Sequence, residues 1–361
     1  MPFALTKVAA SCASAIRIEH PVETSAAVDI PVSIEAPGLA AIASYVPERV
    51  IDNDEIIARF GFERAFLDDK LGIARRHIAR SDESVADMAV AAASELLKRG
   101  QVDAKDIDLV VLCTQNPDYR LPTTADIVQH RLGLPTSVAA FDINQGCSGY
   151  VYGLSVAKAM MLANRWRNGL LITSEAYSKV LDPNDRNTVP LFGDGATATL
   201  LRAGGPGRIG AFTFGSDGGG AEELIVRAGG SRHPDLKCSG DGALRMNGRA
   251  IFNFMMSRVP DDIRACLAAN TLNKEDVDLF LFHQASRFMV ESLGQALKLP
   301  REKVPVEIAE TGNTVSSTLP MLIETIGGLN ALAGKTVLLS GFGVGLSWAS
   351  TILRIDGAAG R

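Results

Sequence analysis

The segment VDAKDIDLVVLCTQ (102–115) recurs later in the chain as LNKEDVDLFLFHQA (272–285). When the two are aligned, Asp108 matches Asp278, and the run LVVLC matches LFLFH. Each copy places an Asp-rich turn directly before a run of mainly apolar residues. Internal similarity at one fixed offset is typical of a chain built from repeated structural units. The recurrence therefore predicts two related halves.

The similarity continues on the carboxyl side of both segments. The turn LGLP (132–135) resembles LKLP (297–300), and VAAFDINQGCSG (138–149) corresponds in position to VPVEIAETGNTVSS (304–317). Both halves therefore predict the same order of elements. This order is a helix, an Asp-rich turn, an apolar strand, an amphipathic helix, an LxLP turn, a strand, and a glycine followed by a polar residue.

Local patterns assign the elements of the first half. Segment 86–99 has the apolar spacing of a helix, whereas 107–113 is a continuous apolar run typical of a buried parallel strand. Alternating strands and helices predict an α/β fold with helices between parallel sheets. We expect a five-layered α-β-α-β-α sandwich of two duplicated halves, 34–204 and 205–361, with the site where the halves meet.

Composition narrows the class of protein. The 361 residues are 47% hydrophobic and 21% charged, an ordinary globular balance, and the net charge of −5 does not favour nucleic-acid binding. Five cysteines, an odd number without paired spacing, indicate a reducing compartment. No stretch approaches the roughly 18 consecutive apolar residues of a membrane span. These features predict a cytoplasmic protein without a nucleic-acid or membrane partner.

Residues 1–33 have a different composition from the rest. They are rich in Ala and Ser, and polar residues such as Lys7, Ser11 and Arg17 interrupt the apolar run that a signal peptide needs. We interpret this segment as an N-terminal extension of unknown role, outside the main fold.

Cys147 is the predicted nucleophile. It follows the expected strand 138–144 and a Gly146 turn, and a helix is expected to start near it. The positive end of a helix dipole favours thiolate, so we expect a reactive thiolate here. Cys113, inside an apolar strand, is interpreted as a core residue.

The repeat predicts two partners for Cys147. Gly312-Asn313 falls where Gly146-Cys147 falls in the first half, and His283 matches Cys113 at the carboxyl end of its strand. Catalytic groups in open α/β sheets gather at the carboxyl ends of strands. Cys147, His283 and Asn313 are therefore expected to converge.

The loop SGFGVGLSWAS (340–350) follows the apolar strand TVLLS. The chain ends too soon after it for a dinucleotide-binding unit. We instead expect the Val344 N–H to join the Cys147 N–H as donors to a developing oxyanion. No zinc spacing occurs, so no metal site is predicted.

These motifs together resemble the β-ketoacyl-acyl-carrier-protein synthase III family of the thiolase superfamily. The resemblance covers Gly38 to Ile355 and includes GI (72–73) with RRH (75–77), NQGCSGYVYGL, DPNDRNTVPLFGDGA, RMNGRAIFNF, HQAS, GNTVSSTLP and GFGVGLSWAS. It implies a thiolase-like fold and a decarboxylative condensation. In that reaction an acyl-CoA primer acylates Cys147, and a malonyl-acyl-carrier protein then attacks to give a 3-oxoacyl product. His283 and Asn313 would stabilise the enolate, acyl-CoA would be a substrate, and no cofactor is implied.

The resemblance also implies binding residues. CoA and the carrier protein would contact Phe66, Lys70, Gly248, Arg249, Ser286 and Arg287. The acyl pocket would be lined by Leu121, Phe192 and Phe342, with Leu121 contributed by the partner subunit of a homodimer.

The chain departs from the family pattern at several positions. Ser286 replaces a usual Asn, Phe66 a usual Trp and Lys70 a usual Arg, while Asn253 and Phe288 replace basic residues of the carrier-docking face. Fewer charges weaken the complementarity to an acidic carrier protein. This favours a specialised pathway over housekeeping fatty-acid initiation.

Three alternatives remain from the sequence. A thiolase-fold acyltransferase could pass the acyl group from Cys147 to an alcohol or amine. A hydroxymethylglutaryl-CoA synthase-like enzyme would need a carboxylate base, for which Glu175 is the nearest candidate. A non-catalytic partner subunit would lose the reactive cysteine, which this chain keeps.

Overall fold

The two Asp-rich repeats form equivalent pieces of the structure, a computed structural model that describes residues 35–99, 102–235, 237 and 240–357. Strand β4 (Leu109–Cys113) follows a 3₁₀ turn at Ala104–Asp106, and strand β11 (Leu279–Phe282) follows one at Lys274–Asp276. The predicted extension 1–33 lies outside the described residues.

The matched aspartates have the same structural role. Asp108 Oδ2 accepts the N–H of Asn168 at 3.0 Å, and Asp278 Oδ2 accepts the N–H of Thr336 at 2.8 Å. Asn168 and Thr336 begin the strands that lie next to β4 and β11. Each carboxylate therefore fixes the register of one parallel pair, and the sequence repeat is a structural repeat.

One nine-stranded sheet runs through both halves. Its order is β11-β12-β13-β8-β1-β7-β6-β4-β5, so the antiparallel β1–β8 pair joins the halves and equivalent strands follow on either side. Besides β4 and β11, its strands are β1 (Pro37–Tyr45), β5 (Ala139–Ile143), β6 (Asn168–Glu175), β7 (Gly195–Ala203), β8 (Gly207–Ser216), β12 (Thr336–Gly343) and β13 (Ser347–Ile355).

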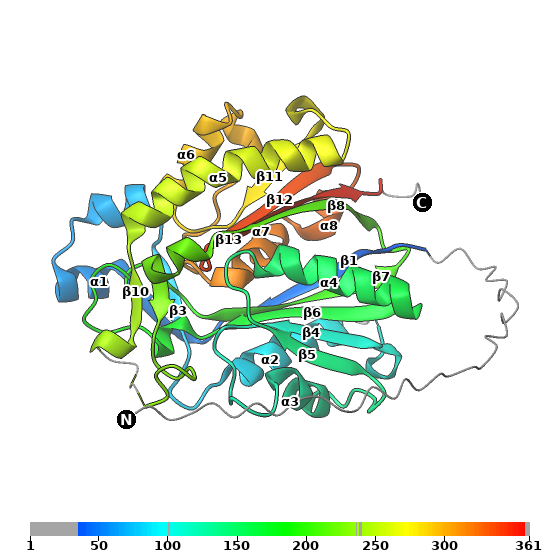
Figure 1. The fold of residues 1–361 in the computed structure, drawn as a ribbon, viewed down its shortest axis with the longest axis horizontal. Coiled ribbons are helices and arrows are strands. Elements are labelled where there is room, and N and C mark those ends of the chain that lie inside the picture. Colours follow the sequence, from blue (N-terminus) through cyan, green and yellow to red (C-terminus); the bar gives the residue numbers. More distant parts are fainter. Residues whose placement is uncertain (1–34, 100–101, 236, 238–239, 358–361) are drawn as a thin grey trace, which may run out of the picture. The chain divides into compact units, whose positions relative to one another are not determined.

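Helices separate and cover the two parts of this sheet (Figure 1). Leucines of α4, α7 and strands of both halves form one buried cluster, so α4 and α7 lie between the two parts. Helices α2 and α3 cover the outer face of the first part, and α5 and α6 that of the second. This arrangement is the predicted five-layered sandwich. The helices are α2 (Val85–Lys98), α3 (Thr124–Arg131), α4 (Gly149–Asn164), α5 (Gly248–Ala269), α6 (Arg287–Ala296) and α7 (Thr318–Thr325).

Smaller elements complete the described chain. They are β2 (Arg49–Asp52), β3 (Arg75–Ile78), β9 (Leu224–Val226), β10 (Leu244–Met246), α1 (Asn53–Phe60), α8 (Gly328–Ala331) and a π-helical turn at Phe66–Leu71. Within the residues that the structure describes, no helix is long and apolar enough to cross a membrane.

The second half lacks one strand that the sequence repeat predicts. Residues 304–308 are not a β-strand, whereas the equivalent β5 is. The Glu307 N–H donates to the Gln284 side-chain oxygen at 3.0 Å instead of to a neighbouring strand. Pro305 has no N–H to offer a β-ladder. The prediction of this strand was therefore wrong, although the segment still leads to Asn313.

Candidate active site

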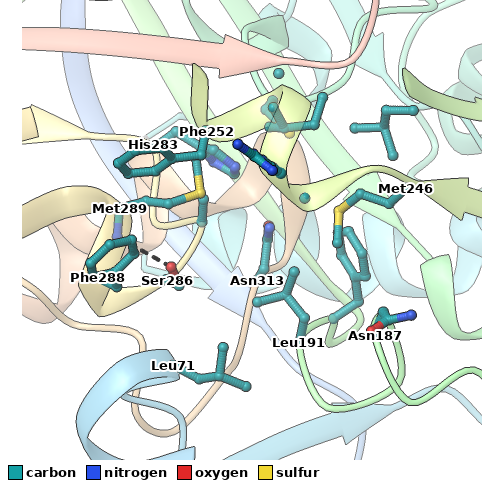
Figure 2. A pocket seen from close by; sticks show the side chains of 18 of the residues that line it. Leu71, Asn187, Leu191, Met246, Phe252, His283, Ser286, Phe288, Met289 and Asn313 are labelled. Atoms are coloured by element: carbon teal, nitrogen blue, oxygen red, sulfur yellow. Dashed lines mark hydrogen bonds between the residues drawn. The ribbon is translucent and has the colours of Figure 1, made fainter. Parts of the chain in front are cut away.

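A cavity of 550 Å³ contains the three residues that the repeat predicts to converge. Cys147 comes from the first half, His283 and Asn313 come from the second, and all three line the same cavity. Figure 2 shows Asn313 rising into this space, with Phe252, Phe288 and Met289 on one flank and Leu191 and Met246 on the other.

The local sequence places Cys147 in a tight turn between β5 and α4. The N–H of Gly149 donates to the carbonyl of Gly146 at 2.7 Å, and α4 begins at Gly149. A Cβ added at Gly343 would lie 2.7 Å from the Cys147 sulfur, so the glycine-rich loop approaches the thiol closely. The backbone amides of Val344 and Cys147 lower the pKa of this thiol.

Burial, not the helix, dominates the acidity of this thiol. Desolvation raises the pKa of Cys147 to about 12, and the hydrogen bonds from the Val344 and Cys147 amides lower it by less. Cys147 lies directly before the N-cap of α4, near the positive end of the helix dipole, which favours the thiolate and so acts against the effect of burial. Burial therefore opposes the expected resting thiolate, and attack by the neutral thiol requires a group that accepts its proton.

His283 follows β11 and is buried. Its Nδ1 lies 2.7 Å from Thr318 Oγ1, which leaves Nε2 as the ring nitrogen available to the cavity. The ring meets Phe342 edge-on, with 5.8 Å between centroids. Helix α6 begins at Arg287. Ser286 is its N-cap, and the Ser286 side chain accepts the N–H of Met289.

The charge state of His283 gives a pH prediction. Desolvation lowers its pKa from 6.5 to about 3, and a backbone hydrogen bond at Val315 raises it by less. The folded enzyme thus keeps His283 neutral as the pH falls through 6.5. We expect CO₂ release from a malonyl thioester to show no acid limb near pH 6.5 in a kcat–pH profile. A loss of activity with an apparent pKa near 6.5 would contradict a neutral His283.

Asn313 is held by backbone and side-chain bonds. Its N–H donates to the Leu191 carbonyl at 2.9 Å, and its carbonyl accepts the Gly193 N–H at 3.1 Å. The side-chain Oδ1 accepts the Val315 N–H at 2.9 Å. This bond fixes the orientation of the amide, so that its Nδ2 group faces the cavity (Figure 2).

The predicted CoA- and carrier-binding residues lie at the mouth of the cavity, with the exception of Arg287. Phe66, Lys70, Gly248, Arg249 and Ser286 all line it. Phe66 is partly exposed and stacks on Phe62, with 5.3 Å between ring centroids. Lys70 lies over the Phe288 ring, and Phe288 stacks on Phe252. The rim of the mouth is therefore aromatic as well as basic.

Three predicted residues do not line the cavity of the single chain. Arg287 packs on Gly72 and lines a neighbouring groove. Leu121 is 86% exposed and lies outside its own cavity, and Val344 contributes only its backbone N–H. Phe192 and Phe342, the other two acyl-pocket predictions, do line it.

Several cavity walls were not predicted from the sequence. Tyr177 stacks obliquely on Phe192, with 5.0 Å between centroids, and its hydroxyl donates to Gln115 Oε1 at 2.6 Å. Further unpredicted lining residues are Leu71, Asn187, Leu191, Leu224, Met246, Ile251, Phe252, Ala285 and Met289.

A buried cation supports the turn beside Asn313. Arg76 is fully buried, and its Nε and Nη1 donate to the Pro190 carbonyl at 2.7 Å and to Asn53 Oδ1 at 2.8 Å. Asn53 also donates to Asp68 in the turn that carries Phe66 and Lys70. Desolvation lowers the pKa of Arg76 to about 10. This network connects the cavity mouth to the wall next to Asn313.

Glu175 does not provide the base that a hydroxymethylglutaryl-CoA synthase-like reaction would need. It is fully buried, does not line the cavity, and accepts the N–H of Gln115 with both oxygens. Desolvation raises its pKa well above the usual value. Its position supports a structural role.

Comparison with solved structures defines the class of protein. The fold matches a crystal structure of 3-oxoacyl-(acyl-carrier-protein) synthase III with a TM-score of 0.86 and 42% identity, over 89% of this chain and 100% of the other. The corresponding Burkholderia xenovorans LB400 synthase matches with a TM-score of 0.81 and 36% identity, over 90% and 95%. The protein is a thiolase-fold acyltransferase of the condensing type.

Sequence comparison identifies the family. The family model described as 3-Oxoacyl-[acyl-carrier-protein (ACP)] synthase III matches residues 141–218, and its C-terminal counterpart matches 267–355. The beta-ketoacyl-[acyl-carrier-protein] synthase III of Streptococcus gordonii is 35% identical over 321 residues, which is 88% of this chain and 98% of that protein. The chain belongs to the β-ketoacyl-[acyl-carrier-protein] synthase III family.

Proposed function

We propose that this enzyme condenses an acyl-CoA primer with malonyl-acyl-carrier protein, releasing CO₂ and forming a 3-oxoacyl-acyl-carrier protein. The observation that carries the proposal is the shared cavity of Cys147, His283 and Asn313 in a chain of this family. Acyl-CoA is a substrate, and the proposed steps use only groups of the chain and its substrates.

Acylation of Cys147 comes first. The sulfur attacks the acyl-CoA carbonyl while His283 Nε2 takes the thiol proton and then passes it to the departing CoA. The N–H groups of Cys147 and Val344, whose influence on the thiol pKa supports their closeness to the sulfur, would stabilise the tetrahedral oxyanion. This route does not require a resting thiolate.

Decarboxylation comes second. Loss of CO₂ from the malonyl group leaves an enolate oxygen that needs neutral hydrogen-bond donors. Asn313 Nδ2 can donate to it because the bond from Val315 to Oδ1 orients the amide, and neutral His283 can donate from Nε2. The enolate carbon then attacks the acyl carbon on Cys147, the carbon–sulfur bond breaks, and the departing thiolate takes a proton from water to restore the thiol.

Binding of the two thioesters takes place at the mouth. Phe66 offers an exposed aromatic face for the CoA base, and Lys70 and Arg249 supply positive charge for its phosphates. Arg287, outside the cavity, would contact the carrier protein together with Gly248 and Ser286 at the rim. The aromatic Phe252–Phe288 pair supports a carrier less acidic than usual, and thus a specialised pathway.

We also propose that the enzyme is a cytoplasmic homodimer. Tyr119 and Leu121 are large apolar residues on one exposed segment, 62% and 86% accessible, and β5 is an edge strand. A second copy would cover both features and bring its Leu121 to the acyl cavity. Cys113, Cys147 and Cys266 are free thiols, which supports a reducing compartment.

Leu121→Phe should shorten the accepted primer. A Phe ring contributed by the partner subunit would fill the end of the acyl cavity. It would weaken transition-state binding of longer acyl chains by roughly 1–3 kcal/mol. The measurement is kcat/KM for acyl-CoA primers of increasing length. Tyr119→Phe, in the same exposed segment, is the matched control and should keep the parent profile. Unchanged relative rates in Leu121→Phe would place Leu121 away from the cavity.

The proposed function is tested by incubating the enzyme with a panel of acyl-CoAs and then with malonyl-carrier protein. Mass spectrometry should find one acyl group on Cys147, and CO₂ should appear only when the malonyl substrate is added. An enzyme that acylates itself but releases no CO₂, and instead acylates an alcohol or amine, would be the alternative thiolase-fold acyltransferase.

A further inference from the structure

One short turn orients both polar catalytic side chains. The Val315 N–H donates to Asn313 Oδ1 at 2.9 Å, and the Val315 carbonyl accepts the hydroxyl of Thr318 at 3.0 Å. Thr318 Oγ1 in turn lies 2.7 Å from His283 Nδ1. All four residues are buried, at most 4% exposed. The turn thus hydrogen-bonds the polar atom of each side chain that points away from the cavity. These atoms are Oδ1 of Asn313 and, through Thr318, Nδ1 of His283.

The backbone of this turn is strained. Val315 has a φ of +56°, in the left-handed region that β-branched residues rarely adopt. Backbone strain of this kind persists where surrounding structure enforces it, and it concentrates at functional sites. Here the strained residue uses its N–H toward Asn313 and its carbonyl toward Thr318. The two peptide groups of Val315 therefore orient the two catalytic side chains, Asn313 directly and His283 through Thr318.

The Thr318 hydroxyl has one proton and two neighbouring acceptors. If the proton points to the Val315 carbonyl, His283 Nδ1 must carry hydrogen to donate to Oγ1, and Nε2 has a free lone pair. If it points to Nδ1, then Nε2 carries the hydrogen. The bond made by one imidazole nitrogen fixes the state of the other. Rotation of a single hydroxyl therefore accommodates both neutral tautomers.

We propose that Thr318 is a positioning residue that supports a different His283 tautomer in each half-reaction. This inference rests on the proposed condensation, whose two steps make opposite demands on Nε2. During acylation Nε2 must be unprotonated, so that it accepts the Cys147 proton as the sulfur–carbon bond forms. It returns that proton to the CoA sulfur as the CoA–acyl bond breaks.

During condensation Nε2 must carry hydrogen. The bond from the malonyl α-carbon to its carboxylate breaks, CO₂ leaves, and the electron pair moves onto the thioester oxygen, which Nε2–H and Asn313 Nδ2–H hold. Between the two steps one proton moves from Nδ1 to Nε2 through water in the cavity, with no change in net charge. Burial keeps the pKa of His283 at about 3, so the ring stays neutral in both states.

Thr318→Val tests the inference because it keeps the shape of the side chain and removes only the hydroxyl. The Val315 carbonyl then remains as the acceptor for Nδ1–H, which holds Nε2 unprotonated. We expect acylation of Cys147 to stay within about threefold of the parent, while CO₂ release falls roughly 10–100-fold. Thr318→Ser, which keeps a hydroxyl, should restore CO₂ release.

Thr199→Val is the matched control. Thr199 is also a fully buried threonine, but its hydroxyl contacts Tyr150 Oη at 3.2 Å. Its loss should leave the ratio of the two half-reactions unchanged. Equal losses of acylation and CO₂ release in Thr318→Val, or no rescue by Thr318→Ser, would overturn the inference.

Nitrogen-15 NMR of the histidine rings gives a readout that does not depend on activity. The His283 signals are assigned by their absence in His283→Gln. The parent should populate both neutral tautomers, and Thr318→Val should hold the ring in the Nδ1–H tautomer alone. Identical tautomer populations would overturn the inference. A parent enzyme that acylates but releases no CO₂ would refute the proposed condensation instead, and the NMR comparison would still decide whether Thr318 controls the tautomer.

Discussion

Cys147→Ala is expected to form no acyl-enzyme from any acyl-CoA. Among the residues that the structure describes, Cys147 contributes the one thiol that lines the cavity with His283. Removal of an enzyme nucleophile lowers kcat on the order of 10⁶-fold. The measurement is intact-protein mass after incubation with acyl-CoA, together with release of free CoA.

Cys113→Ala is the matched control for this variant. Cys113 is also a buried free thiol, but it does not line the cavity, and its sulfur donates to the Gln145 carbonyl. Burial raises the pKa of Cys113 above the usual value. Cys113→Ala should therefore acylate like the parent. A stable acyl group on Cys113 or Cys266 in Cys147→Ala would refute the assignment of the nucleophile.

The convergence of Cys147, His283 and Asn313 could be predicted because the repeat carries spatial information. Asp108 and Asp278 occupy equivalent positions in two equivalent sheets, and their sequence match aligns the strand ends that follow. Groups at those ends come together whatever their separation along the chain. The layer order follows from the same alternation of strands and helices.

Other features depend on contacts that a sequence pattern does not encode. Segment 304–308 occupies the position of β5 in the repeat. It forms no strand, because its backbone groups hydrogen-bond the Gln284 side chain instead. The Cys147 thiol lies at a strand-to-helix turn, as predicted, but its acidity depends on burial by the opposite half. Tyr177 and Met246 reach the cavity only through tertiary packing.

Asn313→Ala should separate the two half-reactions. In the proposed mechanism the carboxamide donates to the enolate, an interaction made chiefly in the transition state for decarboxylation, whereas acylation uses Cys147, His283 and two backbone amides. Loss of one such donor lowers kcat on the order of 10²–10³-fold. We therefore expect near-parent acylation of Cys147 and nearly complete loss of CO₂ release.

His283→Ala provides the contrast, because His283 acts in both steps. It should lose CO₂ release like Asn313→Ala and should also acylate more slowly, since the thiol of pKa about 12 has lost its proton acceptor. The acylation defect should still be smaller than that of Cys147→Ala. Both half-reactions are measured on the same preparations, by mass spectrometry and by CO₂ release. If Asn313→Ala decarboxylates at the parent rate but fails to acylate, the division of roles is wrong, and the carboxamide serves the thiol rather than the enolate.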